Sequence, residues 1–249
     1  MHNIKVWAHR GASGYAPENT LEAFKIAADQ QADGVELDIQ LTKDGELVVI
    51  HDEVIDRVSS GSGLVKDYTL KELKSFNFNK THPEFAFTEI PTLQEVYCLL
   101  KNTSLTINVE LKTGVFFYEG IEEKAVELAR KMNMQDRIIY SSFNHYSVVK
   151  IKMLEPTAKT GFLYTDGFIN MPQYARLMGA DAIHPPFNNL KYPNLIDDCK
   201  KNNILINVWN IWDENIRNCC EMGVNAVITN YPDRTKKLIM QQKQVCNNG

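Results

Sequence analysis

The sequence predicts an α/β protein built as a closed (β/α)8 barrel. Along its 249 residues, short apolar runs rich in β-branched residues alternate with longer segments of helical period. About eight such βα units in about 250 residues match the usual size of this barrel. An open, doubly wound sheet is the alternative, because periodicity alone does not show that a sheet closes.

The first half of the chain supplies four of these units. Its apolar runs predict strands at 5–9, 34–41, 105–112 and 137–143, and its helical periods predict helices at 20–31, 92–101, 118–132 and 146–154. Asn19 or Thr20 is the expected cap of the first helix, since both side chains accept from free backbone N–H groups. Glu22 then lies in the positively charged first turn.

The second half supplies four more units on the same pattern. Strands are predicted at 159–164, 181–185, 204–211 and 226–230, and helices at 171–178, 194–202, 214–222 and 233–244. Gly179 and Gly223 each stand at the end of a helix, just before the sixth and the eighth strand. A left-handed residue is favoured at such positions, and glycine adopts that conformation readily.

One stretch interrupts this alternation. Lys43-Asp44-Gly45 is typical of a hairpin turn, and a further apolar strand is predicted at 47–50. An insertion of about 52–91 follows, containing Ser59-Ser60-Gly61-Ser62-Gly63 and several aromatic residues. It has too few apolar residues for a core of its own, so we expect residues 1–249 to form a single barrel domain.

Charge and composition exclude several classes of protein. Lys and Arg number 27 against 31 Asp and Glu, which gives a formal net charge of −4. This balance argues against a nucleic-acid partner, which needs a basic face to neutralise phosphates. A hydrophobic content of 44% and a charged content of 23% are ordinary for globular proteins and argue against disorder.

Cysteine usage and the N-terminus predict the compartment. The five cysteines are scattered without a C-x-x-C pair, so we expect reduced side chains that act as small apolar residues. The chain has no run of eighteen apolar residues and no signal-peptide pattern at its start. The sequence therefore predicts a cytoplasmic protein without stable membrane insertion, and it does not indicate an oligomeric state.

Polar side chains at the carboxyl ends of barrel strands meet at one mouth, so they are the candidate site residues. Glu36 and Asp38 lie two apart on one strand, and the strand period of two puts both on one face. Glu110 and Lys112 repeat this spacing on the next barrel strand, above Asn108. The other candidates are His9, Arg10, His51, Asp52, His184, Asn207 and Trp209.

Three carboxylates in apolar strands require positive charge nearby, because an unpaired buried charge costs several kcal/mol. An ion pair such as Arg10–Glu36 or Lys112–Asp38 is one solution. A divalent cation is the other, and oxygen ligands without cysteine favour Mg²⁺ or Ca²⁺ over Zn²⁺. Arg10 and Lys112 would then be available for a phosphate group.

His9 and His51 come from different strands and are suited to proton transfer near neutral pH. One would remove a proton from the attacking group, and the other would protonate the leaving oxygen.

The motifs around these residues resemble the signature of the glycerophosphodiester phosphodiesterase family. They read HRGASGYAPENTLEAF at 9–24, GVELDIQLTKDG at 34–45, VIHD at 49–52, NVELK at 108–112, SF at 142–143 and VW at 208–209. This ordered set is long, and it spans essentially the whole chain. The chain departs from the family at 208–212, where it reads VWNIW and the family usually has VWTVN.

The resemblance implies a TIM barrel with a small insertion after the second strand. It also implies a cation-dependent hydrolase that cleaves glycerophosphodiesters, such as glycerophosphocholine and glycerophosphoethanolamine, to sn-glycerol 3-phosphate and an alcohol. One divalent cation is implied, Mg²⁺ or Ca²⁺, with Mn²⁺ as a further candidate. The implied roles are metal ligation by Glu36, Asp38 and Glu110, general acid–base catalysis by His9 and His51, phosphate binding by Arg10 and Lys112, and substrate contacts by Phe143, His184 and Trp209.

Three questions stay open at this level. Attack by water at the cation and attack by a neighbouring glycerol hydroxyl through a cyclic phosphate are both consistent with the residues. The aromatic residues of the insertion permit a lysophospholipase D as the alternative enzyme; they are Tyr68, Phe76, Phe78, Phe85 and Phe87. A catalytically silent barrel that binds phosphate esters is the alternative outside enzymes, whereas the three carboxylates argue against a metal-independent phosphoinositide phospholipase C.

Overall fold

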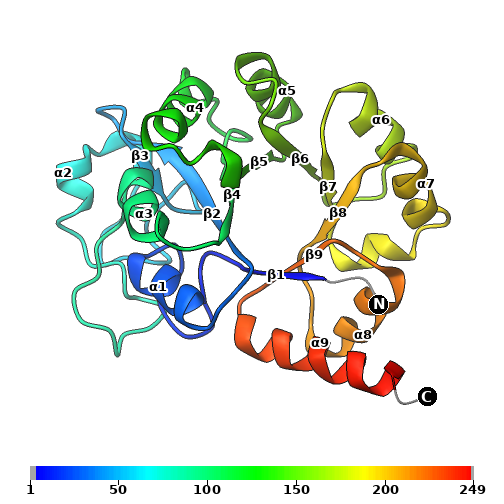
Figure 1. Cartoon of the computed structure of the whole chain (residues 1–249). Coiled ribbons are helices and arrows are strands. Elements are labelled where there is room, and N and C mark those ends of the chain that lie inside the picture. Colours follow the sequence, from blue (N-terminus) through cyan, green and yellow to red (C-terminus); the bar gives the residue numbers. More distant parts are fainter. Residues whose placement is uncertain (1–3, 248–249) are drawn as a thin grey trace.

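The chain forms a closed barrel of eight parallel strands ringed by helices, in a computed structural model that describes residues 4–247 and the side chains of 4–242 (Figure 1). The barrel strands are β1 (Lys5–Ala8), β2 (Gly34–Leu41), β4 (Thr106–Leu111), β5 (Ile138–Ser142), β6 (Lys159–Leu163), β7 (Ala182–His184), β8 (Leu205–Val208) and β9 (Ala226–Thr229). Because β1 pairs with both β2 and β9, the sheet closes on itself. The predicted barrel is confirmed over the open sheet.

Helices follow the strands and cover the outside of the barrel. They are α1 (Leu21–Asp29), α3 (Leu93–Leu100), α4 (Ile121–Met132), α5 (His145–Leu154), α6 (Met171–Leu177), α7 (Leu195–Asn202), α8 (Ile216–Met222) and α9 (Pro232–Asn247). Shorter turns of helix are α2 (Leu70–Leu73) and the 3₁₀ segments Val65–Asp67, Gln135–Arg137, Phe187–Lys191 and Asp213–Asn215. The sequence pattern identified every long helix and missed these short ones, which span too few residues to show a helical period.

The predicted helix boundaries have the expected local causes. Thr20 caps α1 by accepting the backbone N–H of Ala23. Gly179 and Gly223 adopt left-handed conformations, with φ of +79° and +71°, at the ends of α6 and α8. The strand predicted at 204–211 is too long, because β8 ends at Val208 and Asn210 turns the chain with a φ of +55°.

The extra strand β3 (Leu47–Val49) attaches outside the ring to the second half of β2. Only Gly34 and Val35 of β2 pair with the short strand β1, which leaves the later residues of that edge free. Ile39 to Leu41 then pair with β3 in antiparallel register through the predicted hairpin at 43–45. This hairpin carries the chain to the barrel mouth, where the insertion begins.

The insertion and β3 share an apolar cluster that is separate from those of the barrel. Its buried members are Val48, Ile50, Ile55, Val58, Val65, Leu73, Phe78 and Ile90. The insertion therefore buries its apolar residues together with those of the β3 region. Tyr68 and Phe76 pack against the cluster in edge-to-face contact, whereas Phe87 is 56% exposed.

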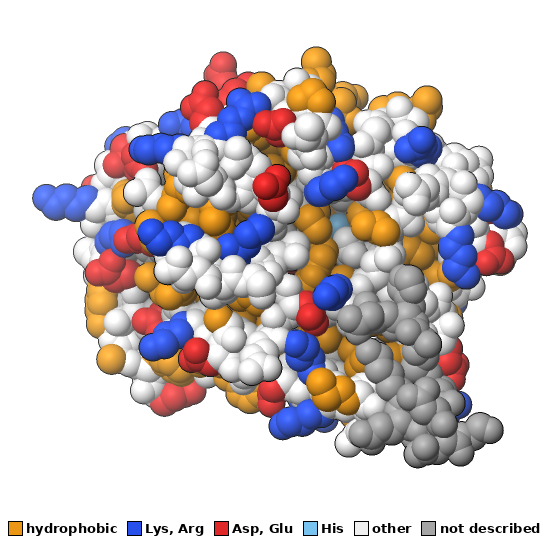
Figure 2. Space-filling model, viewed as in Figure 1, with side chains coloured by type: hydrophobic (Ala, Val, Ile, Leu, Met, Phe, Trp, Pro, Cys, Tyr) orange, Lys and Arg blue, Asp and Glu red, His pale blue; other side chains and the backbone are white. Residues whose placement is uncertain are grey.

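The charged side chains and cysteines follow ordinary patterns. On the face drawn in Figure 2, Lys and Arg are interspersed with Asp and Glu, and neither sign gathers into a patch. Cys199 and Cys219 are buried as expected for small apolar residues, but Cys98 is exposed, and the side chain of Cys246 lies outside the described residues. In the part of the chain that the structure describes, no helix could cross a membrane.

The barrel interior contains polar side chains, and Gly161 leaves space for the ring of His184. Trp7 and His184 meet there edge to face, and Nε2 of His184 lies 2.9 Å from the amide nitrogen of Asn207. A Cβ atom added to Gly161 would clash with the His184 imidazole. Gly161 is therefore required by the close approach of this ring.

We expect Gly161→Ala to destabilise the fold by about 1 to 3 kcal/mol, because the added methyl overpacks the barrel interior. Urea unfolding followed by circular dichroism measures the effect. Gly114→Ala is the matched control, since a Cβ atom there would meet nothing within 4 Å. Equal unfolding midpoints for the two variants would contradict this packing account.

Candidate active site

Three carboxylates converge inside the mouth of the barrel. Glu36 and Asp38 point to one face of β2, and Asp38 is in register with Glu110 of β4. One oxygen atom from each carboxylate lies within 4.8 Å of the others, and the residues are only 4%, 1% and 7% exposed. The sequence prediction of a convergent carboxylate cluster is confirmed by this geometry.

Without added positive charge, the three carboxylates of this triad repel one another. Burial, reinforced by Asp38 and Glu110, raises the pKa of Glu36 well above its usual value. Burial and Asp38 likewise raise the pKa of Glu110. Burial also acts to raise the pKa of Asp38, but the Arg10 guanidinium and other cations outweigh it and hold that pKa at about 2.

The triad fits a hard divalent cation. Its donors are all carboxylate oxygens, which Mg²⁺ and Ca²⁺ prefer. The Oδ1 atom of Asp38 is buried without a hydrogen-bond partner among the described residues, although a buried carboxylate oxygen normally has one. A cation bound by the three residues would satisfy this atom and remove the repulsion between the charges.

Arg10 links the triad to the loop after β1. Its φ of +53° turns its backbone N–H onto Oε2 of Glu36, at 2.9 Å. Its guanidinium lies 3.5 Å from Asp38 and 2.7 Å from Glu18. The ion pair that the sequence suggested between Arg10 and Glu36 is therefore a backbone contact, and the guanidinium pairs with Asp38 and Glu18 instead.

Lys112 lies just beyond β4 and pairs with Glu110 at 3.0 Å, in place of the suggested pair with Asp38. Burial acts to lower the pKa of Lys112, but the Glu110 and Asp38 carboxylates outweigh it and raise that pKa. Its ammonium group also lies 6.0 Å from the centre of the Phe143 ring. The residue is therefore a charged group at the mouth.

His9 lies directly after β1 at the edge of the triad. Its Nδ1 is 2.7 Å from the Asn230 carboxamide oxygen, and its Nε2 is 4.0 Å from Glu36. Loss of surrounding water and the adjacent Arg10 charge lower the pKa of His9 to about 4. Its imidazole is therefore uncharged at neutral pH, and the Asn230 contact leaves Nε2 able to accept a proton.

His51 reaches the same mouth from the end of β3. The backbone N–H of Ile50 donates to the Asp38 carbonyl, and the Gln40 amide donates to the carbonyls of Ile50, His51 and Asp52. These bonds fix the turn that carries the ring. Nδ1 of His51 is 2.6 Å from Asp52, which leaves Nε2 available for proton exchange.

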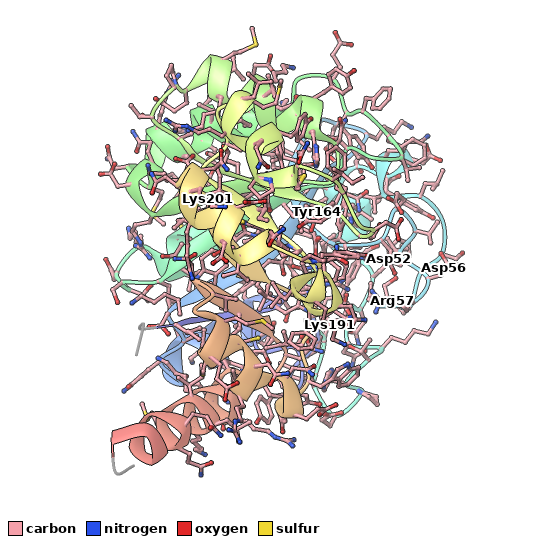
Figure 3. All side chains as sticks on the ribbon, turned by 90° about the vertical axis from the view of Figure 1, so that its right-hand side faces the viewer. Asp52, Asp56, Arg57, Tyr164, Lys191 and Lys201 are labelled. Atoms are coloured by element: carbon pink, nitrogen blue, oxygen red, sulfur yellow. The ribbon has the colours of Figure 1, made fainter. Side chains whose placement is uncertain are left out.

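A chain of ion pairs connects His51 to the triad. Asp52 accepts from Nε of Arg57 at 2.6 Å, and Arg57 donates two bonds to Glu18, both at 2.7 Å. Glu18 in turn pairs with Arg10. Figure 3 shows Asp52 and Arg57 on the side of the molecule away from Lys201, which lies near the end of α7. The insertion thus contributes directly to the mouth.

Phe143 and Trp209 form an aromatic wall beside these charges. Their rings meet edge to face at 6.0 Å, and Phe143 is 42% exposed. The indole N–H of Trp209 donates to the His184 carbonyl at 2.9 Å, which fixes the ring orientation. The His184 ring packs in the barrel interior against Trp7, Gly161 and Asn207 instead of joining this wall, and burial lowers its pKa to about 3.

Sequence reasoning missed several residues of this site. Asn19 donates to Asp38 at 2.9 Å, and Glu18, Arg57 and Asn230 complete the network around the two histidines. Glu18 and Asn19 belong to the motif at 9–24, so that motif was an available signal. Arg57 and Asn230 carried no spacing signal, because their contacts depend on the folded course of loops.

Comparisons with known proteins converge on one family. The model of the glycerophosphoryl diester phosphodiesterase family matches residues 9–234. A glycerophosphodiester phosphodiesterase from Caldanaerobacter subterraneus subsp. tengcongensis is 43% identical over 236 residues, covering 94% of this chain and 97% of the relative. Within the matched region lie the triad, both histidines, Arg10 and Lys112.

Solved structures share the architecture. A phosphodiesterase from Oleispira antarctica, in complex with the product sn-glycerol-3-phosphate, has a TM-score of 0.87 at 28% identity and covers 95% of this chain and 96% of its own. A protein from Silicibacter pomeroyi has a TM-score of 0.88, covering 96% of this chain and 94% of its own. At 21% identity, the second likeness concerns the fold alone.

The raised pKa of Glu36 predicts a pH-dependent response to cations. The folded, cation-free protein keeps a proton on Glu36 that the unfolded chain loses near pH 4.5. This difference in proton binding favours the folded state at low pH, and the stabilisation is lost as the pH rises through the raised pKa of Glu36. A cation binds the deprotonated carboxylates and reverses this loss. We therefore expect Mg²⁺ or Ca²⁺ to raise Tm more at about pH 8 than at about pH 5.

At a cation concentration about 100-fold above Kd, the gain is about 2.7 kcal/mol. Thermal unfolding with and without EDTA at both pH values measures it, and Glu36→Gln is expected to abolish most of the shift. Equal shifts at the two pH values, with the variant unaffected, would refute the cation site.

Proposed function

Because the chain belongs to the glycerophosphoryl diester phosphodiesterase family and is a glycerophosphodiester phosphodiesterase, we propose which substrates it hydrolyses. They are small glycerophosphodiesters, such as glycerophosphocholine and glycerophosphoethanolamine, and the products are sn-glycerol 3-phosphate and an alcohol. The observation that carries the proposal is the convergence of three carboxylates and two histidines at one barrel mouth, beside Arg10 and Lys112.

One divalent cation would be held by Glu36, Asp38 and Glu110, with Mg²⁺ or Ca²⁺ preferred and Mn²⁺ as a further candidate. When bound, it would supply positive charge that offsets the charge developing on the phosphate. The unpartnered Oδ1 of Asp38 and the mutual repulsion of the triad support this assignment.

Arg10 and Lys112 would bind the phosphate of the substrate. Both already lie against the triad, so their charges are placed where a phosphodiester anion would approach. Arg10 is held in place by Glu18 and by its own backbone contact with Glu36, and a fixed guanidinium reduces the entropy lost on binding. Phe143 and Trp209 would border the organic part of the substrate.

His9 and His51 would exchange the protons of the reaction. Each ring has Nδ1 fixed by an oxygen acceptor, Asn230 for His9 and Asp52 for His51, so each presents Nε2. One ring would remove the proton of the attacking hydroxyl, from water or from the glycerol, and the other would protonate the leaving oxygen. His184 is proposed to act indirectly, since its carbonyl fixes Trp209.

Turnover of glycerophosphocholine tests this assignment. We expect His9→Ala and His51→Ala each to lower kcat by about 10² to 10⁴-fold, because each removes a positioned proton-transfer group. EDTA should abolish turnover, and added Mg²⁺, Ca²⁺ or Mn²⁺ should restore it. His82→Ala is the control, since this half-buried histidine contacts Thr81 and Phe85 within the insertion.

Full cation-dependent turnover in either histidine variant would contradict the acid–base roles. Lysophosphatidylcholine is the second substrate in this assay. We expect it to react more slowly than glycerophosphocholine, because most rings of the insertion are packed internally and offer no acyl-binding surface. A faster reaction with the lysophospholipid would favour a lysophospholipase D.

A further inference from the structure

A groove leads away from the catalytic cluster between the segments that follow β8 and β9. It encloses about 440 Å³, within the range of small-molecule sites. His9 and Arg10 line its inner end, next to the carboxylate triad. Trp212, Glu214 and Tyr231 line the rest of the groove, and they come from the segments after β8 and β9. The roles proposed above account for His9 and Arg10 but not for these last three residues.

Aromatic rings form the walls of this groove, and two of them are fixed in the free protein. The Trp209 indole is hydrogen-bonded to the His184 carbonyl and packed on Phe143. Tyr231 packs edge to face on Tyr15 at 5.3 Å. Both rings therefore offer preformed faces, which lowers the entropy lost when a ligand binds.

A third ring comes from the position where the sequence departs from its family. Trp212 lies in the VWNIW segment at 208–212, where the sequence departs from the family motif that it resembles, and it is 66% exposed although it lines the groove. An exposed indole is a large apolar surface whose burial by a ligand is favourable, and its π face attracts cations. The departure at 208–212 therefore changes the chemistry of this groove and not the triad.

The charges of the groove favour a cation. Asp213 is paired with Arg234, so these two charges offset each other. Glu214 has no hydrogen bond or ion pair with any other described side chain, and its carboxylate is left as a free negative charge. The Arg10 guanidinium is already engaged by Glu18 and Asp38, at the inner end.

We propose that this groove binds the alcohol half of the substrate and selects alcohols that carry an ammonium group, through Trp209, Trp212, Tyr231 and Glu214. The inference rests on the proposed hydrolysis of glycerophosphodiesters. Aromatic faces around a carboxylate are the usual recognition site for quaternary ammonium groups. The glycerol half gains less from this groove, because its neutral hydroxyls interact weakly with aromatic faces and carry no charge to pair with Glu214.

Paired substrates test the groove while leaving the reaction unchanged. Glycerophosphocholine carries a cationic alcohol and glycerophosphoglycerol a neutral one. We expect Trp212→Ala and Glu214→Gln each to lower kcat/KM for glycerophosphocholine about threefold to tenfold, mainly through KM, and to leave glycerophosphoglycerol unaffected. Trp212→Phe should recover most of the loss, because it keeps an aromatic face.

Glu221→Gln is the matched control, since this carboxylate lies near the far end of α8 and outside the groove. It should leave both substrates unchanged. Equal losses on the two substrates in Trp212→Ala and Glu214→Gln would place the glycerol half in the groove and overturn the proposal. No loss on either substrate would also overturn it.

Choline binding separates this proposal from the proposed function. Choline should quench the tryptophan fluorescence of the cation-loaded wild type saturably, and Glu214→Gln should weaken that binding about threefold to tenfold. If the wild type hydrolyses neither substrate but still binds choline in this way, the proposed function fails, and the groove stands as a site for ammonium groups only. If choline causes no saturable change, the groove assignment fails whatever the enzyme hydrolyses.

Discussion

The mutual repulsion of three buried carboxylates is the constraint around which this molecule is organised. Glu36, Asp38 and Glu110 are nearly inaccessible to water, and an isolated buried charge costs several kcal/mol. The protein offsets the cost only in part, with Arg10 against Asp38 and Lys112 against Glu110. The raised pKa values of Glu36 and Glu110 express the remainder. A cation bound between the three carboxylates would remove this repulsion.

The insertion takes part in the same electrostatic arrangement. Because β1 is short, the second half of β2 has a free edge, and β3 pairs with it. This pairing carries His51 to the mouth, and Arg57 then joins Asp52 to Glu18. Glu18 also contacts Arg10, so a continuous set of ion pairs connects His51 with the carboxylates of the barrel.

Much of the fold and of the site could be predicted from local patterns in the sequence. The period-two spacing placed Glu36 and Asp38 on one face of β2, and the number and order of helices and strands favoured a barrel. The register with Glu110 and the closure of the sheet come from the strand pairings. Partners across loops could not be predicted in this way. The φ of Arg10 directs its backbone to Glu36 and its guanidinium to Asp38, and no spacing rule contains that turn.

Two other differences have similar physical causes. His184 ends a predicted strand and was expected at the mouth, but its ring turns into the space left by Gly161 in the neighbouring strand. The insertion forms an apolar cluster that includes Val48 and Ile50 of the β3 region. Both outcomes depend on which segments become neighbours after folding, which residue type and local period do not specify.

The location of the cation is the central claim, and diffraction from crystals soaked in Mn²⁺ tests it most directly. The account predicts an anomalous difference peak bounded by carboxylate oxygens of Glu36, Asp38 and Glu110, and its loss in Glu36→Gln crystals treated alike. A mouth without such a peak at saturating Mn²⁺, or a peak held by other residues while the triad stays empty, would contradict the account.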